Sequence, residues 1–179
     1  MLKTFASALG FIAMTADATP RLSSCPDYSP MATFDVNRYT GKWYEIRRDM
    51  YTPFEIAKGC VMAEYTDNGD STLTVENSSH MFIKGWSSGK ALAVVADTGD
   101  ASLVVDFSGK TPSPSDKANY TVLDTDYDTY TVVYSCSDIA GFASFDFLWI
   151  LAREPELDDA TILSIVGKIE EKLPHYGFF

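Results

Sequence analysis

Between Trp43 and Arg153 the sequence is a succession of short apolar segments, rich in β-branched and aromatic residues and separated by turn residues. This spacing is typical of an all-β sandwich or barrel. Asn68-Gly69 and Thr98-Gly99-Asp100 are predicted to form hairpin turns. The alternation predicts eight strands, near residues 42–50, 60–66, 71–78, 90–97, 101–108, 118–124, 129–136 and 144–152.

One helix is predicted after the last strand. Pro155 precedes it, Asp158 is a candidate N-cap, and Pro174 ends it. Apolar residues recur on one face at helical spacing, so this face is expected to pack against the sheet. These residues are Ile162, Ile165, Val166, Ile169 and Leu173.

Residues 1–18 are interpreted as an export signal, which leaves a single domain over residues 19–179. Lys3 supplies a positive charge, Phe5–Met14 is mostly apolar, and Ala16-Asp17-Ala18 matches a cleavage site. A mitochondrial presequence is the alternative, but the segment contains no arginine and one acid. The secreted assignment is therefore favoured.

The charge of the chain excludes some classes of partner. There are 25 acidic and 14 basic residues, and the net charge of −11 disfavours electrostatic binding to nucleic acid or anionic membranes. The sequence has only two histidines and contains no CxxC, HExxH or glycine-rich phosphate motif. No metal site and no cofactor are therefore predicted.

Three motifs occur in a characteristic order. The segment FDVNRYTGKWYEI places a glycine two residues before Trp43 at the start of an alternating strand, Thr125-Asp126-Tyr127 lies late in the chain, and Arg153 ends an aromatic strand. The segments YTVVYSC and DFLWILAREP add to these three motifs. From about Cys25 to Lys172 the sequence resembles the lipocalin family, and within it the apolipoprotein D and bacterial lipocalin families. The resemblance implies an eight-stranded antiparallel up-and-down barrel, one C-terminal helix packed on its wall, and a carrier of small apolar molecules, not an enzyme.

The resemblance also implies structural roles. Arg153 would pack across Trp43 at the closed end of the barrel, a cation–π contact. Cys25 and Cys136 match the cysteines that the apolipoprotein D family bridges. Cys60 matches a second bridging cysteine whose partner lies in a C-terminal tail, and no cysteine follows Cys136 here. Cys60 is therefore expected to be free, or to form an intermolecular bond. The expected structural residues are Gly41, Trp43, Thr125, Asp126, Tyr127 and Arg153.

Alternation assigns the inner faces of most strands, but not of the strand near 60–66. If Cys60 faces outward there, Val61, Ala63 and Tyr65 face inward. Alternation cannot distinguish a filled core from a pocket, whereas the resemblance implies a pocket. In an uninterrupted strand Arg47 would lie on the same face as Trp43. It could then pair with a fatty-acid carboxylate, pair with Glu45, or reach solvent. The expected ligand-binding residues are Arg47, Tyr65, Leu73, Val75, Asn77, Val105, Phe107, Tyr120, Val122, Phe147 and Trp149.

Two further features concern the surface. Asn77 and Asn119 begin glycosylation sequons, and the strand pattern favours a pocket position for Asn77 over a glycan. Phe54, Trp86 and Phe142 are expected on three loops that converge at the mouth of the barrel, where they could contact lipid or close over a ligand.

The leading interpretation is an extracellular carrier that binds one small hydrophobic molecule reversibly. Fatty acids, sterols, retinoids or other isoprenoids, and tetrapyrroles are the candidate ligands. The alternative is a lipid-handling protein associated with a membrane or lipoprotein surface through its mouth loops. A thiol-dependent isomerase that uses Cys60 is a weaker alternative.

Overall fold

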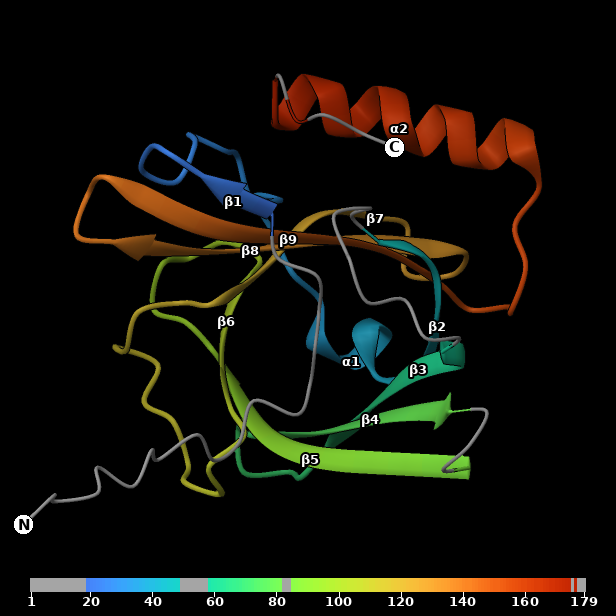
Figure 1. Cartoon of the computed structure of the whole chain (residues 1–179). Coiled ribbons are helices and arrows are strands. Elements are labelled where there is room, and N and C mark those ends of the chain that lie inside the picture. The colour runs from blue at the N-terminus through green and yellow to red at the C-terminus, as the bar shows by residue number, and fades with distance from the viewer. Residues whose placement is uncertain (1–18, 49–57, 82–84, 175, 177–179) are drawn as a thin grey trace, which may run out of the picture.

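The computed structural model describes residues 19–48, 58–81, 85–174 and 176. Eight antiparallel strands, β2 to β9, follow one another around a closed barrel, and β8 and β9 pair along their whole length. Figure 1 shows this ring of strands, with the short helix α1 inside its outline and helix α2 lying across its outer surface. The predicted fold class is confirmed.

The strands of the barrel are joined by hairpin connections, so each strand pairs with the next one in the chain. Their bounds are β2 Gly41–Arg48, β3 Lys58–Asp67, β4 Leu73–Met81, β5 Gly85–Val95, β6 Ser102–Asp106, β7 Tyr120–Thr125, β8 Tyr130–Ile139 and β9 Ala143–Ala152.

All eight predicted strands are present, although β5 begins five residues earlier than expected. The segment from Gly85 to Gly89 shows no apolar alternation, yet it pairs with the end of β4 in a continuous ladder. Trp86, which was expected on a loop, is therefore part of β5. Pairing with β4, rather than local pattern, sets the start of this strand.

Helix α2 (Asp159–Lys172) packs on the barrel wall as predicted. The carboxylate of Asp158 accepts a hydrogen bond from the backbone N–H of Thr161 at 3.0 Å, which confirms the N-cap. Ile165, Ile169 and Leu173 are buried against the outer face of strands β7 to β9. The Lys168 ammonium adds an ion pair with a strand carboxylate of β7, Asp124, at 3.0 Å.

Two short elements are absent from the sequence-based prediction. Strand β1 (Thr19–Arg21) pairs with residues 144–146 of β9, next to the part of β9 that pairs with β2. Helix α1 (Val36–Tyr39) precedes β2, and the side chain of Asp35 caps it by accepting from the N–H of Arg38. Both elements are too short to give a periodic signal.

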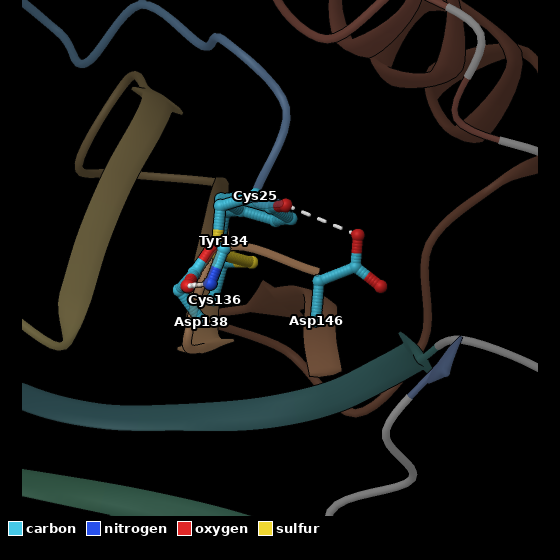
Figure 2. Close-up of a disulfide and its surroundings, with 6 residues drawn as sticks. Cys25, Tyr134, Cys136, Asp138 and Asp146 are labelled. Atoms are coloured by element: carbon cyan, nitrogen blue, oxygen red, sulfur yellow. Dashed lines mark hydrogen bonds between the residues drawn. A yellow bond between two sulfur atoms is a disulfide. The ribbon is translucent and has the colours of Figure 1, made fainter. Parts of the chain in front are cut away.

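The N-terminal segment is attached to the barrel by the predicted disulfide between Cys25 and Cys136. Figure 2 shows this disulfide beside Tyr134, whose hydroxyl donates to the buried carboxylate of Asp146 at 3.1 Å. Tyr28 packs edge-to-face on Tyr134, with ring centroids 4.9 Å apart. The segment after Cys25 therefore covers part of the outer wall of β8 and β9.

Several predictions concern residues outside the described part of the chain. They are the export signal over 1–18 and the mouth residue Phe54. Among the described residues, no helix has both the length and the apolar character required to cross a bilayer.

Candidate ligand-binding site

The closed end of the barrel is organised by Arg153. Its guanidinium lies over the ring of Trp43, with 3.6 Å between the guanidinium carbon and the ring centroid. Its nitrogens donate to the backbone carbonyls of Tyr127 at 2.9 Å, Lys42 at 2.9 Å and Arg38 at 2.7 Å. The contact with Trp43 is the one that the resemblance implied. The three hydrogen bonds, which join α1, β2 and the turn between β7 and β8, were not expected from it.

Gly41 lies beside this contact, in a backbone conformation that favours glycine. Its φ of +93° is unfavourable for other residues, and an added Cβ would lie 3.3 Å from the Arg153 guanidinium.

The turn between β7 and β8 is stabilised by its own side chains. Asp126 accepts hydrogen bonds from the backbone N–H groups of Asp128, Thr129 and Tyr130. Burial raises the pKa of the Asp126 carboxyl, but these hydrogen bonds outweigh it and hold the pKa below its usual value. Thr125 donates to the carbonyl of Tyr130 at 2.6 Å. This turn therefore presents the Tyr127 carbonyl to Arg153 in a fixed position.

Above Trp43, three tyrosines form the floor of the barrel interior. Tyr39 comes from α1, Tyr65 from β3 and Tyr120 from β7. The hydroxyl oxygens of Tyr39 and Tyr65 each lie 2.7 Å from that of Tyr120. The Trp43 indole N–H donates to the carbonyl of Tyr39 at 2.8 Å. The sequence analysis missed Tyr39 because it belongs to the unpredicted helix α1.

The register of the strands determines which predicted site residues face inward. Most of the expected ligand-binding residues lie on the inner face, together with the buried core of the barrel interior. These inward-facing residues are Tyr65, Leu73, Val75, Asn77, Val105, Tyr120, Val122, Phe147 and Trp149. Phe107 does not join them, because it follows the end of β6 and is 49% exposed.

The inner face differs in accessibility along the barrel axis. Tyr65, Leu73 and Val75 are each only 3% exposed, so they belong to the packed floor. Closer to the mouth, Trp149 and Phe147 are only partly buried. Side chains therefore fill the closed end and leave accessible inner surface toward the mouth.

Two opposite walls of the upper interior have different character. On β9, the rings of Phe147 and Trp149 are stacked, with centroids 5.7 Å apart and planes inclined by only 6°. On β4 and β5, which lie across the barrel from β9 in Figure 1, four of the inward positions hold small residues. They are Ser79, Ser87, Gly89 and Ala91. This arrangement combines a flat aromatic surface with small side chains opposite it.

The expected position of Arg47 is wrong. A β-bulge between Glu45 and Arg47 interrupts the alternation of β2, so Arg47 pairs with the outward-facing Ile150. Arg47 is exposed and lines a shallow groove of about 220 Å³ between the barrel and the start of α2. The bulge turns Arg48 inward instead, opposite Trp149.

Arg48 and Glu45 form an ion pair on the inner face. The Nε of Arg48 lies 3.4 Å from Oε1 of Glu45. The side chain of Arg48 is only 15% exposed and that of Glu45 only 13%. The interior therefore contains a basic and an acidic group beside the aromatic wall. Alternation alone could not identify Arg48, because a bulge leaves no reliable signature in one sequence.

The two sequon asparagines have different environments. Asn77 faces inward, opposite Ala63 and Gly89, as the strand pattern predicted. Asn119 is exposed, but its side-chain amide makes two hydrogen bonds with the backbone of Val105, at 2.8 and 2.9 Å. Glycosylation of either residue stays a prediction.

Cys60 is free and exposed. It occupies a bulge of β3 with a φ of +52°, and the following residue, Val61, continues the inner face. Among the described residues, no group of three or more His, Cys, Asp or Glu side chains is arranged to hold a metal ion.

The sequence and the fold can be compared with those of known proteins. The lipocalin-like domain family matches residues 34–176 of this chain. The chain belongs to the lipocalin family. Apolipoprotein D of Rattus norvegicus is 32% identical to this lipocalin over 164 residues, covering 90% of this chain and 83% of the relative. Apolipoprotein D of Bos taurus is 35% identical over 148 residues, covering 79% and 72%.

A solved structure supports the same fold for this lipocalin. Insecticyanin from the tobacco hornworm Manduca sexta superimposes with a TM-score of 0.69 at 24% identity, over 87% of this chain and 82% of insecticyanin. At this level of identity the similarity concerns the fold alone.

Proposed function

We propose that this lipocalin is an extracellular carrier that binds one small hydrophobic molecule reversibly in the upper half of its barrel, without turnover. The observation that carries the proposal is the partly buried aromatic stack of Phe147 and Trp149, which faces small residues across the interior. An apolar, concave surface with a few polar groups is typical of small-molecule sites.

Export is supported by the disulfide between Cys25 and Cys136, since such bonds persist in oxidising compartments. The predicted export signal agrees with it. Membership of the lipocalin family supports binding of an apolar ligand but does not select one. Native mass spectrometry of the purified protein, followed by organic extraction, would identify any ligand that copurifies.

Trp149 offers a direct test of the binding site. Titration with an apolar ligand should quench tryptophan fluorescence, because the indole lies on the inner wall. The Trp149→Phe variant should lose most of this quenching while retaining binding measured by a ligand-based signal. Trp86→Phe is the matched control, since Trp86 lies on the outer wall against His80 and is 61% exposed. Quenching that is lost in Trp86→Phe but kept in Trp149→Phe would exclude the proposed site.

A second candidate function is contact with a neutral lipid surface. Trp86, Phe107 and Phe142 are 61%, 49% and 66% exposed, and each lies at the mouth end of its strand or turn. Burying each side chain completely contributes roughly 1.5–3 kcal/mol, so partial insertion of three could hold one molecule on a bilayer. The net charge of −11 favours neutral over anionic vesicles.

The lipid-surface proposal predicts cosedimentation with neutral vesicles. The variant Trp86→Ser, Phe107→Ser, Phe142→Ser should remain in the supernatant, while Leu163→Ser should sediment like the wild type. Leu163 is a suitable control because it is 71% exposed on α2, away from the mouth. Wild-type protein that ignores neutral vesicles, or a triple variant that binds them equally well, would exclude this function.

A further inference from the structure

The three tyrosines at the floor of the barrel form a continuous chain of hydroxyl groups. The Thr131 hydroxyl donates to Tyr39 at 3.3 Å, and Tyr39 and Tyr65 both lie 2.7 Å from the central Tyr120 hydroxyl. Burial raises the pKa of Tyr39 to about 12 and raises the pKa values of Tyr65 and Tyr120 well above their usual range. All three phenols therefore keep their protons at neutral pH.

Counting hydrogens in this chain leaves one without an acceptor. Thr131, Tyr39, Tyr65 and Tyr120 carry four hydroxyl hydrogens, whereas they make three hydrogen bonds with one another. Among the described residues, none other than these four accepts the fourth hydroxyl hydrogen. Buried donors are rarely left without an acceptor, because the missing bond costs about 1–3 kcal/mol.

The three tyrosines differ in exposure, and Tyr120 is the one best placed to meet a ligand. Tyr39 is fully buried and Tyr65 is 3% exposed, whereas Tyr120 is only partly buried. If Tyr39 and Tyr65 both donate to Tyr120, the two lone pairs of Tyr120 are used and its own hydrogen is free. Two donated hydrogen bonds also polarise the Tyr120 hydroxyl and make it a stronger donor.

We propose that Tyr120 donates a hydrogen bond to an uncharged oxygen of the ligand, such as a carbonyl oxygen, at the floor of the barrel. This proposal rests on the proposed carrier function and defines the chemistry of its ligand. A carboxylate is disfavoured at this position, because one phenol is poor compensation for a buried charge.

The test compares two probes that differ by one group. Octanoylnaphthalene carries a carbonyl where octylnaphthalene carries a methylene, and both present the same flat ring to the aromatic wall. The wild type should bind the ketone roughly 3- to 10-fold more tightly, the typical net value of one hydrogen bond. The Tyr120→Phe variant should bind the two probes with equal affinity.

Infrared spectroscopy of the carbonyl-labelled ketone gives a readout that loss of packing would not mimic. Relative to the ketone in an apolar solvent, binding to the wild type should lower the carbonyl stretching frequency, and Tyr120→Phe should abolish this shift. Tyr65→Phe should reduce the shift without abolishing it, because Tyr120 keeps its hydrogen but loses one donor. Tyr44→Phe, the same change on the outer face of β2, should behave like the wild type.

The possible failures can be distinguished. If the wild type binds both probes equally, or if Tyr120→Phe leaves the carbonyl frequency shifted, the tyrosine site is wrong while the carrier function stands. If neither probe binds the wild type, the carrier function itself fails. If Tyr120→Phe does not fold, two other results would still overturn the proposal. One is a carbonyl stretching frequency that does not shift in the wild type, and the other is a shift of equal size in the wild type and in Tyr65→Phe.

Discussion

Arg153→Ala is expected to lower the melting temperature by about 8–15 °C. The substitution removes three hydrogen bonds from a charged donor and the contact with the face of Trp43. Hydrogen bonds to charged groups contribute about 1.5–3 kcal/mol each when buried, but Arg153 is partly exposed, so a total of about 3–4 kcal/mol is expected. For a domain of this size, 1 kcal/mol corresponds to roughly 2–4 °C.

Two variants isolate the cause of this loss. Arg153→Lys keeps the positive charge but cannot reach three carbonyls with one ammonium group, so it should recover only part of the stability. Arg47→Ala should have little effect, because Arg47 is exposed and its guanidinium donates to a neighbouring carbonyl, that of Ile46. A melting temperature for Arg153→Ala within 2–3 °C of the wild type, roughly what 1 kcal/mol gives, would mean that the closed end is held by other contacts.

Removal of the disulfide is expected to have a comparable effect. Cys25 and Cys136 close a loop with a sequence separation of 111 residues. On the chain-entropy model, opening such a loop costs about 4–5 kcal/mol, which corresponds to roughly 10–20 °C in melting temperature. The double variant Cys25→Ala, Cys136→Ala should show this shift in thermal unfolding followed by circular dichroism.

Cys60→Ala is the matched control, since Cys60 is free and exposed, and its melting temperature should stay close to that of the wild type. Peptide mapping without reduction should recover the Cys25–Cys136 pair and a labelled Cys60. A crosslinked peptide that contains Cys60 would contradict this assignment.

The fold was largely predictable because its determinants are local or repeated. Eight alternating segments separated by turns define the strands, and the cap residue Asp158 defines the start of α2. The roles of Trp43, Arg153 and the bridged cysteines followed from the motifs by which the sequence resembles lipocalins.

The interior was less predictable, because alternation assumes an uninterrupted strand. The bulge in β2 exchanges the roles of Arg47 and Arg48, and it depends on how β2 pairs with β9 rather than on local sequence. Tyr39 reaches the barrel floor from a four-residue helix that has no periodic signal. The tyrosine chain depends on three elements distant in sequence, so it becomes visible only when they are assembled.

The amide of Asn119 has a consequence for the timing of glycosylation. Its oxygen accepts from the N–H of Val105 and its nitrogen donates to the carbonyl of Val105, so the side chain takes the place of a peptide group in the β6–β7 ladder. In the folded barrel the nitrogen is held in this pairing and is not free to act as a nucleophile. Transfer of a sugar to Asn119 would require both hydrogen bonds with Val105 to break, so occupancy of this sequon is expected to fall as β6 and β7 pair more quickly.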